Sequence, residues 1–393
     1  MALGIYISVP FCRTKCSYCN FASDVFSKVV FERYVERVCA DVEGVMGIAA
    51  QMGGQIEREV DSIYLGGGTP TVLEAEQLAR IFDAVRAQFG VVADAEITVE
   101  CAPGTLTSPV IDGLLRCGVN RASLGVQSFV DAEAAVVGRL HKRATVLEDI
   151  GRLRGAGVTN INVDLIAGLP HQTAASWEIS LAEAVACGAP HVSVYMLEVD
   201  EDSRLGREVM AGGTRYHAHF VPDEDATADF YLTACEKLEA AGIAQYEISN
   251  FARAGFESRH NLKYWTRRPY LGFGVDAHSM LVSLAADADA VRFWAADSLD
   301  GYVAGAPWQR TAVSRQAALE ESFFLGLRLT SGVHLGELSE RFGPEGVGQY
   351  RGPIAECVDD GLLERDGDLV RLTSRGRLLS NEVFQQFILA RAG

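Results

Sequence analysis

A short apolar segment near the start of the chain leads directly into a loop with three cysteines: Ile5-Tyr6-Ile7-Ser8-Val9-Pro10-Phe11-Cys12-Arg13-Thr14-Lys15-Cys16-Ser17-Tyr18-Cys19-Asn20-Phe21. We expect residues 5–9 to form a β-strand. The thiols of Cys12, Cys16 and Cys19 are close enough along the chain to turn toward one metal centre. Iron–sulfur clusters and structural zinc usually take four protein ligands, so three cysteines leave one position open. The spacing therefore allows a cluster with an open iron, or a zinc site with a distant fourth ligand.

Short apolar segments alternate with helical patterns over the first two-thirds of the chain. We expect further strands at 61–65, 96–100, 121–126, 160–166 and 191–197, and helices at 29–49, 73–89, 107–117, 130–156 and 173–187. This alternation is typical of α/β folds and predicts a partial or complete (β/α) barrel of parallel strands. In such folds the functional groups gather where the strands end. The polar groups at predicted strand ends are the cysteine loop, Gly66-Gly67-Gly68-Thr69-Pro70, Glu100, Gln127 and Asp164.

The last third of the chain has a different pattern. Residues 254–280 are rich in glycine, aromatic and basic residues and are predicted to form a binding loop. Helical patterns from about 315 precede a hairpin with its turn at Asp366-Gly367, an arrangement that resembles a winged-helix module. We expect three parts: a barrel over 1–250, a connecting segment over 251–310 and a C-terminal helical, winged-helix-like domain over 311–393.

Composition narrows the class of protein. The net charge of −17 argues against a general nucleic-acid binder, because phosphate contacts need clustered lysine and arginine. No apolar run reaches the roughly 18 residues needed to span a bilayer, and the first residues resemble a strand more than a targeting leader. We expect a cytoplasmic protein, with peripheral contact at the inner membrane left open. The cysteines outside the loop are scattered, as expected of reduced core cysteines.

The arrangement Cys-x-x-x-Cys-x-aromatic-Cys, with Tyr18 as the aromatic residue, resembles the radical S-adenosylmethionine (SAM) superfamily. The resemblance implies that Cys12, Cys16 and Cys19 hold a 4Fe–4S cluster and that SAM binds its open iron. In that superfamily an electron from the cluster cleaves SAM to methionine and a 5′-deoxyadenosyl radical, while the protein supplies placement and exclusion of water.

Later segments resemble the oxygen-independent coproporphyrinogen III oxidase family in order and spacing. They surround Glu100, Gln127, Arg139 and Asp164, the last within Asn162-Val163-Asp164-Leu165-Ile166-Ala167-Gly168-Leu169-Pro170. By this resemblance the SAM contacts are Tyr6, Tyr18, Gly67, Gly68, Thr69, Glu100, Gln127, Arg139 and Asp164. Carboxylates suit ribose hydroxyls or an ammonium group, and an arginine can pair with a carboxylate in a fork.

Three features indicate a branch of this family. Asn20-Phe21 follows the third cysteine, where the oxidase branch carries a fourth cysteine, and the N-terminal extension of that branch is missing. His260-Asn261-Leu262-Lys263-Tyr264-Trp265 resembles the His-Asn-x-x-Tyr-Trp motif of the HemW-type heme chaperones. This resemblance implies heme as cargo, recipient hemoproteins, membrane-associated ones among them, and an electron donor for the cluster. The alternatives are a coproporphyrinogen III dehydrogenase of porphyrin biosynthesis and, from another class, a zinc-stabilised adaptor.

His260 is the candidate heme contact. Tyr264 and Trp265 offer flat apolar surface for a macrocycle, and Lys263, Arg267 and Arg268 could pair with propionates. The alternative is that these aromatic residues pack the loop against the barrel. A second metal-binding candidate, His217-Ala218-His219, lies on an irregular segment.

Overall fold

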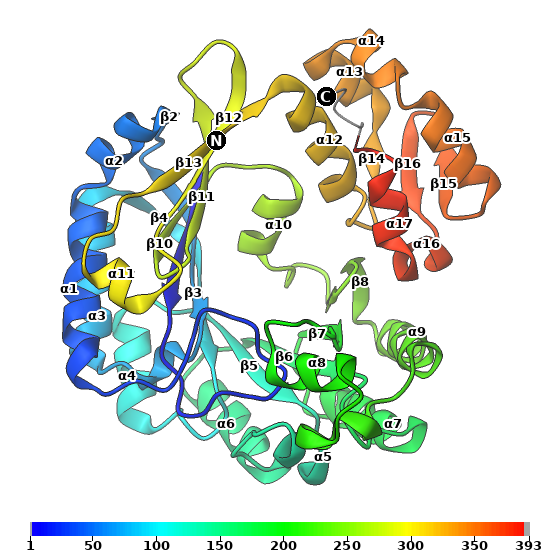
Figure 1. Cartoon of the computed structure of the whole chain (residues 1–393). Coiled ribbons are helices and arrows are strands. Elements are labelled where there is room, and N and C mark those ends of the chain that lie inside the picture. Colours follow the sequence, from blue (N-terminus) through cyan, green and yellow to red (C-terminus); the bar gives the residue numbers. More distant parts are fainter. Residues whose placement is uncertain (1, 389–393) are drawn as a thin grey trace.

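The computed structural model describes residues 2–388 and is built around one large, curved sheet (Figure 1). Seven neighbouring strands of this sheet run parallel, in the order β10-β1-β3-β4-β5-β6-β7. Their bounds are Tyr270–Gly274, Leu3–Val9, Glu59–Gly67, Gly90–Cys101, Arg121–Gln127, Asn160–Ala167 and His191–Met196. The predicted partial (β/α) barrel is confirmed.

Antiparallel strands extend both edges of the parallel array. On one side lie β11 (His278–Ser283), β12 (Ala288–Trp294) and β13 (Gln309–Ser314), with the short β2 (Gly54–Gln55) paired to β11. On the other side lie β9 (Asn250–Ala252) and β8 (Ala244–Glu247). Residues 254–280, predicted to be a binding loop, instead include α10 (Arg259–Trp265), β10 and the start of β11. The segment 251–310 thus contributes strands to the main sheet.

Helices cover the outer face of the sheet (Figure 1). They are α1 (Val29–Glu43), α2 (Val45–Met52), α3 (Ala75–Gln88), α4 (Ser108–Arg116), α5 (Asp131–Val136), α6 (Arg143–Gly155), α7 (Ala174–Ala186) and α9 (Glu224–Ala240). Two predicted helices, 29–49 and 130–156, are each divided in two. The second division matters for the site, because the turn between α5 and α6 contains Gly138, with a φ of 86°, and Arg139.

Short helices lie after strand ends or within the connections between longer elements. They are η1 (Pro70–Val72), α8 (Arg204–Met210), η2 (Arg215–Phe220) and α11 (Leu299–Val303). In contrast, α10 lies inside the curve of the sheet, where His260 and Lys263 approach Gly4 of β1 (Figure 1). No helix within residues 2–388 is long and apolar enough to cross a membrane.

The C-terminal part has its own small sheet, in the order β14-β16-β15, and its own apolar cluster. The strands are Val333–His334, Leu369–Leu372 and Leu363–Asp366; the helices α12 to α17 are Arg315–Gly326, Leu335–Phe342, Pro344–Gly348, Arg351–Asp359, Ser374–Leu378 and Ser380–Gln385. The hairpin turns at Gly367, which has a φ of 58°. Its apolar cluster also includes Ile248, Met280 and Val313 of the barrel part.

Candidate functional site

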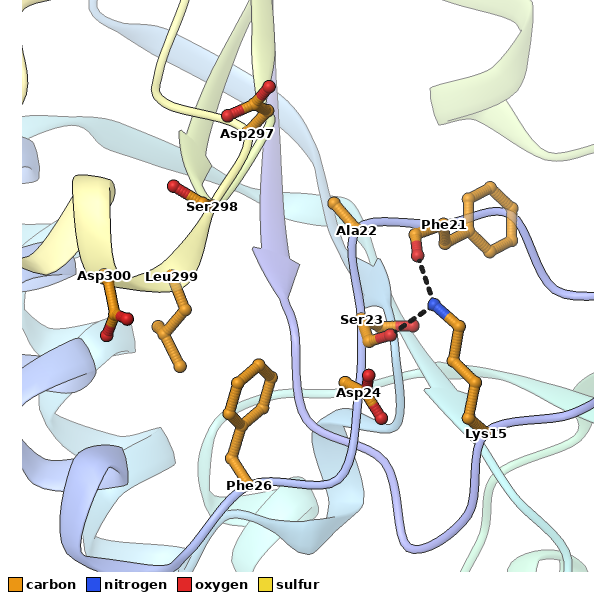
Figure 2. Close-up of a pocket in the computed structure, with 10 residues that line it drawn as sticks. All are labelled: Lys15, Phe21, Ala22, Ser23, Asp24, Phe26, Asp297, Ser298, Leu299 and Asp300. Carbon is orange, nitrogen blue, oxygen red and sulfur yellow. Dashed lines mark hydrogen bonds between the residues drawn. The ribbon is translucent and has the colours of Figure 1, made fainter. Parts of the chain in front are cut away.

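The cysteine loop follows β1 and folds back on itself. The Cys12 N–H donates to the Asp24 carbonyl at 2.9 Å, and the Cys19 N–H donates to the Cys16 carbonyl at 3.3 Å. Figure 2 shows the Lys15 ammonium reaching two carbonyls further along the loop; it donates to that of Phe21 at 2.8 Å and to that of Ser23. The side chain of Lys15 is therefore used to close the loop.

A shallow hollow of about 290 Å³ lies between this loop and the start of α11. Its lining residues include Phe21 and Phe26 of the loop and Asp297 and Leu299 near α11, with Phe26 drawn beside Leu299 in Figure 2. Neither Glu100 nor Asp164 lines this hollow.

The three thiols lie in one loop, but they are not arranged around a common point as the ligands of one metal would be. Cys16 is buried and its Sγ accepts from Arg139 Nη1 at 3.5 Å; the half-buried Cys12 accepts from Thr69 Oγ1 at 3.9 Å. Burial raises the pKa of the Cys12 thiol. Within residues 2–388 no three His, Cys, Asp or Glu side chains are gathered closely enough to hold a metal ion. By chemistry the loop still suits an iron–sulfur cluster, since it offers three cysteine thiols, the ligands that such clusters take.

The glycine run packs the end of β3 tightly against the base of the cysteine loop. The Gly68 N–H donates to the Val9 carbonyl at 2.8 Å, and the Thr69 N–H donates to the Phe11 carbonyl at 2.7 Å. A Cβ on Gly68 would lie 2.7 Å from that Phe11 oxygen, so a side chain cannot be accommodated there. Gly67 has a φ of 96°, which also favours glycine. The expected SAM-contacting glycines and the cysteine loop are thus direct neighbours.

Two carboxylates point into the barrel, that of Glu100 near the end of β4 and that of Asp164 within β6. Glu100 accepts from the Tyr64 hydroxyl at 2.9 Å and from the Gly67 N–H at 3.2 Å. Burial, and then the nearby charge of Asp164, raise the pKa of Glu100 to about 7. Asp164 accepts from Ser123 Oγ at 3.1 Å and from Asn162 Nδ2 at 2.7 Å, and burial raises its pKa as well.

Tyr6 and Tyr18 have different surroundings. The Tyr6 ring stacks on Tyr64 with centroids 6.0 Å apart, beside Glu100, and burial raises the pKa of its hydroxyl. Tyr18 packs against a small apolar cluster of Val137, Ile166 and Leu169. Tyr6 therefore belongs to the wall of the candidate site, and Tyr18 anchors the cysteine loop to the end of β6.

Arg139 connects the cysteine loop to the end of β5. Besides its bond to Cys16, its guanidinium donates to the Gly125 carbonyl through Nη2. Gln127, which ends β5, has a φ of 68°, an uncommon conformation for a residue other than glycine. A Cβ on Gly125 would lie 2.9 Å from Arg139 Nη2 and 3.1 Å from Gln127 Nε2. The structure therefore gathers the expected residues around one region at the strand ends.

His260 does not have the surroundings expected of a heme contact. The residue is 1% exposed, its Nδ1 lies 3.0 Å from Ser62 Oγ and its Nε2 lies 2.9 Å from the Tyr264 hydroxyl. Burial lowers the pKa of the imidazole to about 3. Both ring nitrogens are engaged inside the barrel, so neither is available to iron in this conformation.

The basic residues near His260 are also satisfied within the protein. Lys263 is buried and pairs with Asp61 at 2.6 Å, and Arg267 pairs with Glu321 at 2.8 Å and Asp289 at 3.2 Å. Only Arg268 is exposed among the three cations considered for propionates. The alternative interpretation of this motif, packing of the segment against the barrel, agrees with these contacts.

Arg121 is a candidate site residue that sequence reasoning did not single out. It begins β5, is 2% exposed and has no hydrogen-bond partner for its Nε within the described chain. Its positive charge lowers the pKa of Glu100 and of Asp164. The only signal in the sequence was a charged residue at the first position of a predicted strand. Such a residue more often lies in solvent at the end of the strand.

Comparisons with known proteins agree on one relationship. The model described as "Radical SAM superfamily" matches residues 6–184, and that described as "HemN C-terminal domain" matches residues 313–379. A Bacillus subtilis (strain 168) protein named "Heme chaperone HemW" is 35% identical over 98% of each chain. A protein of Escherichia coli (strain K12) with the same name is 32% identical, again over 98% of each.

The chain also resembles a solved structure. Coproporphyrinogen III oxidase (HemN) from Escherichia coli matches with a TM-score of 0.82 over 98% of this chain and 90% of that one. The two sequences are 23% identical, so this likeness supports the fold alone.

Proposed function

Because this chain belongs to the radical SAM superfamily and, within it, to the HemW family, we propose that it is a heme chaperone that delivers heme to hemoproteins. The observation that carries the proposal is the relationship to proteins named heme chaperone over nearly the whole length of both chains. The Asn20-Phe21 sequence after the third cysteine adds support, because it lacks the further cysteine of the resembling oxidase branch.

Membership of the superfamily implies a 4Fe–4S cluster and SAM. We propose Cys12, Cys16 and Cys19 as the cluster ligands. When bound, the cluster supplies the electron for reductive cleavage of SAM, or acts as a regulatory or structural group. Arg139 holds the Cys16 thiol and the end of β5 together, and Thr69 donates toward Cys12. These contacts support a role for both residues in holding the loop in place.

The SAM site that we propose lies beside the cysteine loop. Glu100, its partner Gly67 and the adjoining Gly68 and Thr69 form one wall, with Tyr6 close by. Gln127, Arg139 and Asp164 lie toward the ends of the next strands. Carboxylates at this position can accept from ribose hydroxyls or an ammonium group, and the buried interior excludes water from them.

We also propose protein partners and a cellular location for this protein. An electron donor and a recipient hemoprotein are the protein partners, and the transfer takes place in the cytoplasm or at the inner face of the membrane. We propose no nucleic-acid partner. We also propose that the described part of the predicted 311–393 domain, residues 311–388, is a winged-helix-like unit, which the small sheet supports; residues 389–393 lie outside the described chain.

Heme transfer tests the proposal directly. The protein is reconstituted anaerobically with iron and sulfide, loaded with heme, and mixed with an apo-hemoprotein whose heme-dependent activity is followed. We expect heme binding with a shifted Soret band and activation of the recipient. As a control, Cys12→Ser should lose the cluster absorbance and keep heme binding.

A second assay separates the chaperone from the enzyme. The reconstituted protein is incubated with coproporphyrinogen III, SAM and a reductant. Protoporphyrinogen formed over many turnovers would replace the chaperone proposal by the dehydrogenase. Reconstitution that yields no iron–sulfur absorbance would contradict the cluster assignment, and stoichiometric zinc in the purified protein would favour an adaptor.

A further inference from the structure

An exposed surface near the mouth of the barrel gathers three of the chain's histidines; we call it the histidine face. It consists of His171, which follows β6, and of Tyr216, His217, His219 and Phe220 of η2. The His171 N–H donates to the Phe220 carbonyl at 2.9 Å, which joins the two segments. These two segments, distant in sequence, therefore present a single surface.

The histidine face is exposed and partly apolar. The Phe220 ring lies between two imidazoles, with centroid distances of 4.0 Å to His171 and 4.0 Å to His219 and interplanar angles of 32° and 41°. Phe220 is 47% exposed, and Met210, which ends the neighbouring α8, is 63% exposed. Exposed aromatic, imidazole and thioether groups on one surface suit a planar ligand, because each can contact its ring through dispersion.

The backbone of the histidine face is held in an uncommon conformation. His171, Tyr216 and His217 have φ values of 66°, 53° and 60°, in the left-handed region that L-residues rarely adopt. Such conformations cost free energy and persist where surrounding structure holds them, often at binding sites. Here they turn the imidazoles of His171 and His217 toward each other.

One imidazole of this face is prepared to bind a metal through its free nitrogen. His217 Nδ1 lies 3.0 Å from His171 Nε2, so one of these nitrogens carries the shared proton. When His217 Nδ1 is the donor, its Nε2 has a free lone pair, and the hydrogen bond fixes the ring orientation. This is the arrangement in which a second histidine orients a metal-binding one.

The number of ligands favours heme over a bare ion. Within residues 2–388 no three potential ligand side chains converge, as a bare divalent ion would need. A porphyrin already supplies four nitrogens to its iron and needs only one or two axial ligands, most often imidazole. On the basis of the proposed heme-chaperone function, the geometry points to the histidine face as the heme-binding site, with His217 Nε2 as an axial ligand and Phe220 against the macrocycle.

Other histidines are less suitable. His141, His191 and His260 are buried, and each has a ring nitrogen in a hydrogen bond. His278 is exposed but stacks on Trp294 and faces Asp276 at 3.7 Å, and His334 lies alone at the start of α13. The histidine face is therefore the one place in the described chain where exposed imidazoles gather.

Cationic side chains near this face can pair with the heme propionates. Arg215 directly precedes Tyr216 in η2, and the Arg204 guanidinium lies over the Tyr216 ring at 5.9 Å from its centroid. Arg204 and Arg207 also line a hollow of about 400 Å³ beside Cys19. Heme on the histidine face would thus lie close to the cysteine loop.

Heme titration of histidine variants tests the assignment. His217→Asn is the main variant, because asparagine tolerates a positive φ better than most residues and preserves the turn. His334→Asn is the matched control, an exposed histidine on the C-terminal part. We expect His217→Asn to weaken heme binding at least about tenfold and to shift the Soret band toward that of free heme, while the control behaves as wild type.

A second variant addresses the orienting histidine. His171→Asn retains a hydrogen-bonding side chain and tolerates the positive φ but lacks the imidazole, and we expect a several-fold weaker affinity with the Soret shift retained. Wild-type protein that binds no heme would overturn the proposed function together with this site. Wild-type binding that is matched by His217→Asn in affinity and Soret maximum would overturn the site alone.

Discussion

At the level of single residues, the charge of Glu100 controls the proposed SAM site. Its pKa is raised to about 7, so the carboxylate is partly protonated at neutral pH in the ligand-free protein. A carboxylate that accepts from SAM must be ionised, so SAM binding should strengthen as the pH rises from about 6 to about 8. We expect SAM affinity, measured by calorimetry, to follow this pH dependence. In Glu100→Gln the affinity for SAM should be lower, with only the pH dependence of SAM itself remaining. A pH profile identical to that of the wild type would show that Glu100 does not bind SAM.

Arg121 provides a second test of the same titration. Its buried charge lowers the pKa of Glu100, so removing that charge should raise this pKa above about 7. In Arg121→Met the midpoint of the SAM-binding pH profile should therefore move to higher pH. Arg121→Lys keeps the charge and should keep the wild-type midpoint. An unmoved midpoint in the methionine variant would leave Arg121 with a packing role only.

His260 should contribute to stability and not to heme binding. His260→Ala leaves the hydroxyls of Ser62 and Tyr264 without a partner, so we expect unfolding free energy to fall by about 2 kcal/mol. Heme titration of this variant should give the wild-type Soret band. A changed Soret band with unchanged unfolding temperature would instead favour direct heme contact.

The pH dependence of stability gives a further readout for His260. Its folded-state pKa is lowered to about 3, while the unfolded chain takes up this proton near 6.5. The unfolded state therefore binds more protons between these values, and the stabilisation present above pH 6.5 is lost as the pH falls toward 3. Chemical denaturation over this range should show a smaller loss in His260→Ala than in wild type.

The candidate site could largely be predicted because its residues follow strands in order. Glu100, Gln127 and Asp164 occupy the ends or interiors of consecutive parallel strands, and the motif around each is local in sequence. The surroundings of His260 could not be predicted in this way. They depend on Ser62, which is nearly 200 residues away in sequence.

At the level of elements, the local pattern predicts the strands that alternate with helices and the hairpin at Asp366-Gly367, but it does not predict β10 as a strand. β10 lies within residues 254–280, whose glycine, aromatic and basic residues predict a binding loop. These glycines serve close strand contacts: a Cβ on Gly272 would lie 2.2 Å from the His278 carbonyl oxygen, and one on Gly274 would lie 2.3 Å from that of Ser8. The reason for each glycine lies in a neighbouring strand, and the sequence of β10 alone does not contain it.

The link between α8 and the cysteine loop gives an element-level prediction. The Leu205 N–H donates to the Ser17 carbonyl at 2.7 Å, and Arg204 Nη2 donates to the Lys15 carbonyl at 2.6 Å. Arg204→Met removes one of these bonds and should loosen the loop, so that a chelator removes iron from the reconstituted protein several-fold faster. The control is Arg310→Met, which also removes an arginine bond to a carbonyl, that of Met52, away from the loop. Equal rates of iron loss would show that α8 does not stabilise the loop.

At the level of the whole molecule, one carboxylate connects the C-terminal part to the barrel part. Glu321 of α12 is buried and pairs with Arg267, which follows α10, and with Arg292 of β12. Arg267 also pairs with Asp289, and Arg328 pairs with the buried Glu247 of β8. The apolar cluster of the C-terminal part thus includes Ile248 and Met280 from before the predicted boundary near residue 310, and ion pairs also link the two sides of that boundary. No local pattern could indicate this, because each partner comes from a different part of the chain.

Glu321→Gln tests how much these ion pairs stabilise the molecule. The variant keeps the shape of the side chain but leaves Arg292 without a carboxylate partner and Arg267 with Asp289 alone, so we expect the unfolding free energy to fall by about 3 kcal/mol. Glu340→Gln, an exposed position on α13, should change it by less than about 0.5 kcal/mol. Denaturant unfolding measures both.

A triple replacement then distinguishes charge from packing. Arg267→Met, Arg292→Met and Glu321→Leu together remove all three charges and keep apolar volume, and buried ion networks replaced in this way often regain stability. We expect the triple variant to be more stable than Glu321→Gln alone, because no buried charge is left unpaired. A triple variant that is less stable than Glu321→Gln would mean that the charges hold the two parts in register, and heme transfer by that variant should then be impaired as well.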